Sequence, residues 1–238
     1  MTDLSKKVER AKRLIQSASV DGQIVEVAYS GGKDSDVILA LTQMAGIPFK
    51  AIYKNTTIDP PGTIKHCKSK GVDIRNPKQS FYEIISKNGF PNRFRRFCCR
   101  FLKEYKILDK SIVGIRSEES VKRAARYKEP TQCRVYTNGD RSEQFFPILD
   151  WTTEDILQFI ISENIQLHPL YYRNDGTIDI SKRLGCIGCP LASENNRIKS
   201  FLKYPNMVKL YLRGGKTSLT PTGIQRQEKH TKQPMTIS

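Results

Sequence analysis

Six consecutive residues, Ser30 to Ser35, carry the clearest chemical pattern in the sequence, which reads Ser-Gly-Gly-Lys-Asp-Ser. The pair of glycines lets the backbone turn tightly and point several N–H groups outward. An apolar, β-prone run at 24–29 precedes this turn, and apolar residues at helical spacing follow it at 37–44. The positive N-terminal end of that helix would add to the backbone N–H groups, so the loop is suited to hold an anion such as phosphate. An ordinary strand–turn–helix junction is the alternative.

Four of the six cysteines form a second pattern. Cys98 and Cys99 are adjacent, and Cys186 and Cys189 form a C-x-x-C pair much later in the chain. Adjacent residues of a helix point about 100° apart, so both can reach one centre only if that centre is large. A 4Fe–4S cluster, with its separated corners, suits the adjacent pair better than a single zinc ion. Zinc, or buried thiols without any metal, stay open as alternatives.

The residues around these cysteines are aromatic and cationic. Phe94, Phe97, Phe101 and Tyr105 are predicted to form one apolar face of a helix. Cationic side chains would offset thiolate and cluster charge and lower the thiol pKa values; they are Arg93, Arg95, Arg96, Arg100, Lys182 and Arg183. The other two cysteines, Cys67 and Cys133, show no partner pattern and are interpreted as structural.

Alternating strands and helices must position these groups. Strands are predicted at 24–29, 49–53, 72–74, 111–115 and 144–149, and helices at 60–69, 81–85, 118–126, 153–163 and, in two pieces, 193–213. Such alternation predicts an α/β fold with a doubly wound, mainly parallel sheet and a small Cys-containing C-terminal helical region. The expected organisation is an N-terminal helix (1–23), a nucleotide-binding domain (24–165), a C-x-x-C helical region (166–213) and a flexible basic tail (214–238). The glycine pair at 214–215 is predicted to end a helix.

Composition narrows the function classes. The chain has 238 residues, 38% of them hydrophobic, and 40 Lys and Arg against 24 Asp and Glu give a net charge of +16. This charge suits either a nucleic-acid substrate or a small anionic substrate beside a basic surface. No apolar run is long enough to span a bilayer, and the charged N-terminus does not resemble a signal peptide, so a cytoplasmic protein is expected.

The loop at 30–35 resembles the pyrophosphate-binding PP-loop of ATP pyrophosphatases, which cleave ATP between its α and β phosphates. It is not a Walker A motif, because Val27 stands where that motif needs its first glycine. The PP-loop together with Cys-Cys and a distant C-x-x-C resembles the phosphoadenylylsulfate (PAPS) reductase family over residues 24–192. Further segments similar to that family are 114–123, 147–155 and 183–186.

The resemblance implies ATP and Mg²⁺ as ligands and a 4Fe–4S cluster, or zinc, held by Cys98, Cys99, Cys186 and Cys189. It implies that Ser30, Gly31, Gly32, Lys33, Asp34 and Ser35 hold the pyrophosphate of ATP, with Lys33 and Asp34 as catalytic residues. Lys33 would neutralise the leaving pyrophosphate, and Asp34, with Asp59 as a second candidate, would bind Mg²⁺. Helix N-capping is the alternative role for Asp34.

Arg116 and Arg123 match the family segment that grips the sulfate or phosphate end of the nucleotide. A solvated basic helix face is the alternative for both. His66, His168 and His230 show no metal or base pattern and are assigned no role.

Two departures from the reductases matter. The sequence has no cysteine after Cys189, where reductases carry their nucleophile, and its PP-loop is intact. Both traits are similar to the adenylate-forming enzymes of DNA phosphorothioation and tRNA thiolation, which implies DNA or tRNA as acceptor and a cysteine desulfurase as sulfur donor. A reductase with its nucleophile from elsewhere, and a non-catalytic metal-bearing nucleic-acid-binding protein, are the alternatives.

Overall fold

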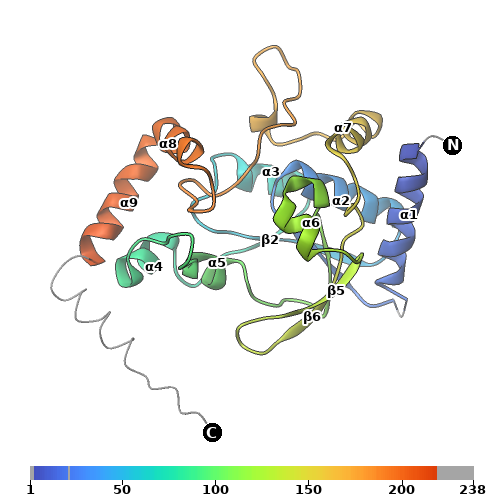
Figure 1. Cartoon of the computed structure of the whole chain (residues 1–238), viewed down its shortest axis with the longest axis horizontal. Helices are drawn as coiled ribbons and strands as arrows, with labels where there is room; N and C mark the ends of the chain where they lie inside the picture. Colours follow the sequence, from blue (N-terminus) through green and yellow to red (C-terminus); the bar gives the residue numbers. More distant parts are fainter. Residues whose placement is uncertain (1–2, 21, 219–238) are drawn as a thin grey trace, which may run out of the picture. The chain divides into compact units, whose positions relative to one another are not determined.

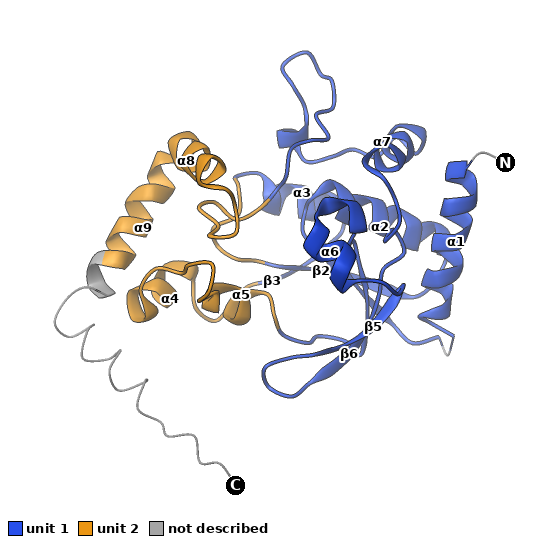
Figure 2. Ribbon diagram, in the orientation of Figure 1, with its two compact units in different colours: residues 1–54, 61–75, 105–184 blue, residues 55–60, 76–104, 185–238 orange. Residues whose placement is uncertain are grey.

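The computed structural model describes residues 3–20 and 22–218 (Figure 1). The chain divides into two compact units, each of them discontinuous in sequence (Figure 2). Unit 1 comprises residues 1–54, 61–75 and 105–184, and unit 2 comprises residues 55–60, 76–104 and 185–238. Unit 2 thus combines the C-terminal segment with two segments from the middle of the chain.

Unit 1 is built on a six-stranded sheet with the strand order β3-β2-β1-β4-β6-β5. Neighbouring strands are parallel except β5 and β6, which are antiparallel. The predicted α/β fold with a mainly parallel sheet is therefore confirmed. The strands are β1 (Val25–Tyr29), β2 (Phe49–Lys54), β3 (Asp73–Arg75), β4 (Lys110–Val113), β5 (Thr131–Val135) and β6 (Arg141–Phe145).

The core of unit 1 forms where apolar strand residues meet the helices. In the middle of the sheet, Val27 pairs with Ala51 on one side and Ile112 on the other, and all three are buried. Helix α2 packs against α1, α7 and β1. The helices of unit 1 are α1 (Asp3–Ser17), α2 (Lys33–Ala45), α3 (Thr63–Ser69), α6 (Val121–Arg126) and α7 (Thr153–Ser162), with 3-10 turns η1 (Ser117–Glu119) and η2 (Pro169–Tyr171).

The start of α7 shows how local sequence fixes an element. Thr152 caps the helix, and its side chain and the Asp155 side chain exchange hydrogen bonds with each other's backbone N–H groups. Lys7 of α1 donates to Asp155 at 2.7 Å. Burial opposes ionisation of this carboxyl, but the hydrogen bonds from Lys7 and Thr152 outweigh it and hold the pKa of Asp155 below its usual value. The cap of α7 therefore also attaches the N-terminal helix α1.

Unit 2 is helical and has its own small core. Its helices are α4 (Phe81–Asn88), α5 (Phe97–Leu102), α8 (Glu194–Lys203) and α9 (Pro205–Ser218). Helix α9 packs against α4 and α8, and α4 packs against α5. The buried side chains of this core are Ile58, Phe81, Ile84, Ile85, Cys98, Leu102 and Tyr211.

Four sequence predictions are wrong in detail, and the first three concern the sheet and the helices α5 and α6. The strand predicted at 144–149 overlaps β6 only at residues 144 and 145. Its hairpin partner β5 was missed because the exposed residues of β5 show no alternating apolar pattern. Residues 117–126 form η1 and α6 rather than one helix, because Ser120 is extended and caps α6. The predicted apolar face of α5 is wrong as well, since Phe94 is 97% exposed and Cys98 and Leu102 are the buried residues.

The glycine pair at 214–215 does not end a helix, because α9 continues to Ser218. A Cβ on Gly214 would lie 2.8 Å from Ile85, and a Cβ on Gly215 would lie 2.1 Å from the ring of Phe90. The glycines therefore allow α9 to approach the α4 region closely. The rest of the predicted tail, residues 219–238 with His230, lies outside the described residues. None of the described helices is long and apolar enough to cross a bilayer.

We expect Gly214→Ala to lower the free energy of unfolding by about 1–3 kcal/mol, because Ile85 is fully buried and cannot move aside for the new methyl group. The sign of this change is informative, because replacing glycine by alanine inside an uncrowded helix raises the free energy of unfolding by about 1 kcal/mol. Urea denaturation measures the change. Gly185→Ala is the matched control, because a Cβ there meets nothing within 4 Å. A Gly214→Ala midpoint at or above that of wild type would contradict the close packing.

Candidate functional site

Two loops of unit 1 meet at the point where the strand order of the sheet reverses. β1 lies between β2 and β4, so the loop after β1 and the loop after β4 leave neighbouring strands at the same edge. Ligands of open α/β sheets bind at such a point. A Cβ on Gly114, after β4, would lie 3.0 Å from the carbonyl oxygen of Asp34, so a glycine is needed where the two loops touch.

The PP-loop is a tight turn into α2. Gly31 has a left-handed φ of +76°, and Gly32 stands at the N-cap of α2 without a side-chain cap. Ser35 donates to the carbonyl of Gly32 at 2.6 Å, and the Ser30 and Ser35 hydroxyls are 3.3 Å apart. The helix start thus presents its positive end at a glycine turn, which is the arrangement that binds phosphate groups.

Asp34 is held between two cations. Lys33 Nζ lies 3.0 Å from one of its carboxylate oxygens, and Arg116 Nε lies 2.8 Å from the other. Lys33 and Arg116 are 4% and 3% exposed. Arg116 also donates to Glu118 at 2.8 Å and to the Trp151 carbonyl at 3.2 Å. Arg116 is therefore an anchor for the loop after β4, and Asp34 is not the N-cap of α2.

Arg123 and Arg183 form a more exposed cationic pair near this anchor. Arg123 makes an ion pair with Glu119, and Arg183 donates to the backbone carbonyl of Glu119 at 3.1 Å. Partial burial, and then repulsion from Arg183, lower the pKa of Arg123, whose charge also interacts with Asp34 and Arg116. Lys33 and Arg116 thus flank Asp34, whereas Arg123 and Arg183 flank Glu119. The four cations of this region favour an anionic ligand.

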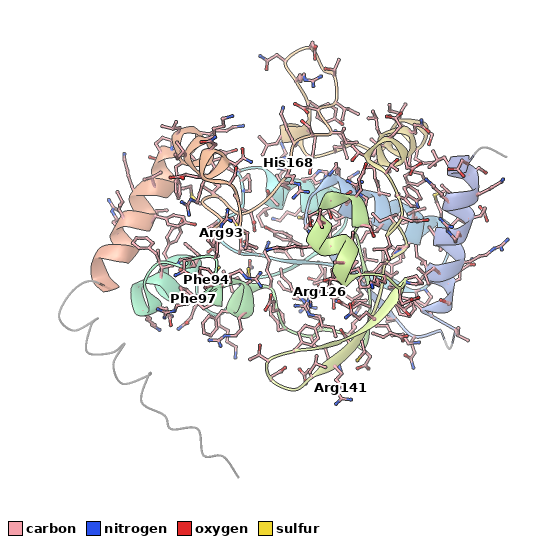
Figure 3. All side chains as sticks on the ribbon, in the orientation of Figure 1. Arg93, Phe94, Phe97, Arg126, Arg141 and His168 are labelled. Carbon is pink, nitrogen blue, oxygen red and sulfur yellow. The ribbon has the colours of Figure 1, made fainter. Side chains whose placement is uncertain are left out.

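A buried polar network behind the PP-loop was missed by the sequence analysis. Tyr29 donates to Asp36, and His66 Nε2 lies 3.1 Å from both oxygens of that carboxylate. The ring of His168 contacts His66 edge-on at 5.7 Å; Figure 3 labels His168. Burial, and then the negative charge of Asp36, raise the pKa of Tyr29. These contacts attach α3 to the first turn of α2. The sequence signal for this network is Asp36, an aspartate among the apolar residues of α2.

Tyr171 was missed as well. Its hydroxyl accepts from the backbone N–H of Lys33 at 3.2 Å and from that of Leu184 at 3.4 Å. Tyr171 is buried, and burial raises the pKa of its hydroxyl. Nothing in its sequence neighbourhood distinguishes it, because its partners are distant in the chain.

The four predicted cysteine ligands all lie in unit 2, where they line one pocket that is partly open to solvent. Cys186 and Cys189 flank Gly188, whose left-handed φ of +70° makes their turn possible. The described residues contain no group of three or more His, Cys, Asp or Glu side chains arranged to hold a metal ion. The remaining lining residues are Thr56, Ile58, Phe81, Leu102, Lys103, Pro190 and Tyr211.

Asp59 and Lys103 give this pocket its charge. Asp59 accepts from Cys186 Sγ at 3.4 Å and from the Thr56 hydroxyl at 2.6 Å. Asp59, a predicted candidate for Mg²⁺, thus contacts two residues that line the cysteine pocket of unit 2. Desolvation opposes the charge of Lys103, but attraction to Cys186 and Asp59 outweighs it and raises its pKa.

The adjacent cysteines differ in acidity. The hydrogen bond between them favours the thiolate of Cys99 and lowers its pKa to about 6, aided by Lys103 and Arg96 and opposed by burial. The same hydrogen bond, together with burial, raises the pKa of Cys98. Burial raises the pKa of Cys186 to about 11 although Lys103 opposes it. Of the other two cysteines, Cys67 is buried in the core of unit 1, whereas Cys133 is exposed on β5.

Comparison with known proteins decides the family. The family model for the phosphoadenosine phosphosulfate reductase domain matches residues 24–192. The chain belongs to this family. Both the PP-loop and the four cysteines of the pocket lie within the matched residues, so the resemblance drawn from those motifs is confirmed.

Individual relatives agree with the PAPS reductase family. An uncharacterized protein of Methanocaldococcus jannaschii is 30% identical over 74% of this chain and 38% of its own length. Sulfate adenylyltransferase subunit 2 of Aeromonas salmonicida is 25% identical over 72% of this chain and 66% of its own. The crystal structure of PAPS reductase from Candida auris shares the fold, with 16% identity, a TM-score of 0.50, and 78% and 96% of the two chains covered. The chain spans half or less of the length of three curated relatives that it matches.

Asp34, the predicted Mg²⁺ ligand, is engaged by two cations. Both carboxylate oxygens of Asp34 are already paired with cations, and a Mg²⁺ ligand must offer oxygen to the ion instead. The four thiols of the cysteine pocket, with their cationic neighbours, are donors of the kind that an iron–sulfur cluster uses, although they are not arranged as a site for a metal ion.

We expect Cys99 to be alkylated by iodoacetamide with a half-maximal rate near pH 6 in protein prepared without bound metal. The thiolate is the nucleophile, so the rate rises with pH through the pKa, and a pKa of about 6 places this rise unusually low. Peptide mass spectrometry distinguishes Cys99 from the other thiols. Cys98→Ala removes the hydrogen bond and should move the midpoint upward, whereas an unchanged midpoint would contradict the thiol–thiolate pair.

Proposed function

We propose that unit 1 binds ATP and cleaves it between the α and β phosphates, and that the protein uses the resulting adenylate to activate an acceptor for sulfur transfer. The observation that carries this proposal is the glycine turn at the start of α2, with buried Lys33 beside it, at the switch point of the sheet. Sulfate adenylyltransferase subunit 2, a relative by sequence, supports it because its name states adenylyl transfer.

The proposed reaction is an in-line displacement at the α phosphorus. A nucleophilic oxygen or sulfur of the acceptor forms a new bond to the α phosphorus, while the bond to the oxygen that bridges α and β breaks and its electron pair leaves with pyrophosphate. Ser30, Ser35 and the backbone N–H groups of residues 31–34 would hold the β and γ phosphates. Lys33 would neutralise the charge that develops on the leaving pyrophosphate.

The remaining charged residues would take different roles. Asp34 would orient Lys33 and Arg116, because it contacts both. Arg116 would add positive charge to the site while it holds the loop after β4. Arg123 and Arg183, whose side chains are 40% and 64% exposed, would reach the anionic group of the acceptor.

The cysteine pocket of unit 2 would hold a 4Fe–4S cluster through Cys98, Cys99, Cys186 and Cys189. When bound, such a cluster supplies a redox-active iron–sulfur centre. Lys103 and Arg96 would offset its negative charge, because both already stabilise the thiolate of Cys99.

Product analysis tests the activity. With ATP labelled in the γ phosphate, the proposal predicts AMP and labelled pyrophosphate, whereas a P-loop type NTPase yields ADP and phosphate. The assay is run with candidate acceptors, because the acceptor is the nucleophile. Without a sulfur donor it measures exchange of pyrophosphate into ATP, and with a sulfur donor it measures net pyrophosphate release. Formation of ADP, or sulfite release from adenylylsulfate with a thiol reductant and no turnover of ATP, would overturn the proposal.

A further inference from the structure

One exposed segment of unit 2 is both aromatic and strongly cationic, and its exposed phenylalanines and most of its arginines have no part in the proposed chemistry of the two sites. Residues 84–103 contain six Lys and Arg and no Asp or Glu. Arg93, Arg95, Arg96 and Arg100 are exposed, and none of them forms an ion pair among the residues that the structure describes. We call residues 93–101 the arginine–phenylalanine segment. Its positive charge is therefore available to an anionic partner.

Phe94 is presented to solvent by a defined turn. Its side chain is 97% exposed. The Asn92 side-chain oxygen accepts from the backbone N–H of Phe94 at 2.9 Å and from that of Arg95 at 2.8 Å. Such an Asx turn fixes the backbone on both sides of Phe94. Figure 3 labels Arg93, Phe94 and Phe97 on this segment.

A second aromatic group extends the same segment. Phe101 is 47% exposed, and the guanidinium of Arg100 lies over its ring at 5.0 Å. Because Cys98 and Leu102 are the buried residues of α5, Phe101 and Arg100 lie on its open side. Aromatic rings interleaved with arginines provide the two contacts that a nucleic-acid strand needs, stacking for bases and charge for phosphates.

We infer that the arginine–phenylalanine segment binds a single-stranded nucleic acid, with a base stacked on Phe94 and phosphates contacted by Arg93, Arg95 and Arg96. A single strand fits better than a duplex, because bases in a duplex are already stacked on each other and cannot reach an exposed ring. An acidic protein would pair with the arginines, but it would offer no flat group to stack on the exposed ring of Phe94. The net charge of +16 agrees with a polyanionic partner.

The arginine–phenylalanine segment also contains two residues of the cysteine pocket. Cys98 and Cys99, which line the cysteine pocket, are part of the same nine residues. A strand on this surface would therefore lie beside that pocket within unit 2. The inference that the bound strand accepts sulfur rests on the proposed function. The inference that a strand binds to the arginine–phenylalanine segment does not.

Fluorescence anisotropy of labelled oligonucleotides with the full chain tests the inference. Single-stranded DNA, single-stranded RNA of the same sequence, and the DNA duplex form its three arms. Phe94→Ala should weaken single-strand binding by about 5- to 150-fold without changing its salt dependence. Phe94→Trp should restore it, and Leu202→Ala, a truncation at a side chain that is 76% exposed on α8, should have no effect.

A second pair of variants tests the contribution of the arginine charges to binding. Arg95→Gln should weaken binding and reduce the slope of log K against log salt by about 0.7, because one phosphate contact is lost on a single strand. Lys199→Gln is the matched control, since it removes one charge from an exposed position of α8. The DNA and RNA arms identify which nucleic acid is preferred.

Several outcomes would overturn the inference: equal binding by wild type and Phe94→Ala, a duplex bound as tightly as the single strand, or self-association of the protein that Phe94→Ala abolishes. The two proposals fail separately. Pyrophosphate release from ATP without strand binding would reject only the inference about the arginine–phenylalanine segment. Strand binding without pyrophosphate release would reject only the proposed function.

Discussion

Lys33→Met is expected to lower kcat/KM for pyrophosphate release by about 10²–10³-fold, the usual effect of removing one preorganised charge from a developing anion. Lys33 is 4% exposed and its ammonium group is already held at 3.0 Å from Asp34 at the start of α2. The charge is thus positioned before ATP arrives and needs little reorganisation. Methionine preserves most of the volume, so the packing around the loop should persist.

Radiolabelled pyrophosphate is measured alongside thermal unfolding, because loss of Lys33 leaves Asp34 paired with Arg116 alone. Lys199→Met, at an exposed position of α8, controls for the loss of one positive charge. A Lys33→Met variant that unfolds like wild type and keeps its pyrophosphate release would show that the PP-loop does not carry the chemistry. An equal loss in the control would point to an effect of overall charge.

Much of the fold could be predicted because its strands are short, apolar and separated by helical patterns. The buried run of β1 and the apolar spacing of α2 place the Gly31-Gly32 turn between a strand and a helix, and the structure has it there. Local signals of this kind depend only on neighbouring residues. The hairpin partner β5 lacked such a signal, since its side chains are largely exposed and its pairing with β6 alone defines it.

The interior of the site could not be predicted, because its contacts join residues that are far apart in sequence. Arg116 reaches Asp34 across 82 positions, and His66 reaches Asp36 across 30. The sequence predicts that Arg116 binds substrate and predicts no role for His66, whereas the structure places both in buried contacts with carboxylates. The position of Asp59 also differs from the prediction, because its contacts with Thr56 and Cys186 place it beside the cysteine pocket.

The second large effect is expected at the cysteine pocket. Protein purified without oxygen should be brown and hold about four iron atoms per chain, and Cys186→Ser should remove both the colour and the iron. Cys186 interacts with Cys98, Cys189, Asp59 and Lys103, so it is the thiol that links the other groups of the pocket. Its substitution should therefore prevent assembly of a cluster rather than weaken one ligand bond.

Iron analysis and electron paramagnetic resonance measure this effect, with Cys133→Ser as the control because that thiol is exposed on β5 of unit 1. Colourless wild-type protein with one zinc per chain would contradict the cluster, as would a Cys186→Ser variant that keeps its iron. Exchange of pyrophosphate into ATP should survive Cys186→Ser, because the PP-loop and its ion pairs belong to unit 1 and the cysteines to unit 2. Loss of sulfur transfer with exchange intact would then assign adenylation and sulfur chemistry to different units of the chain.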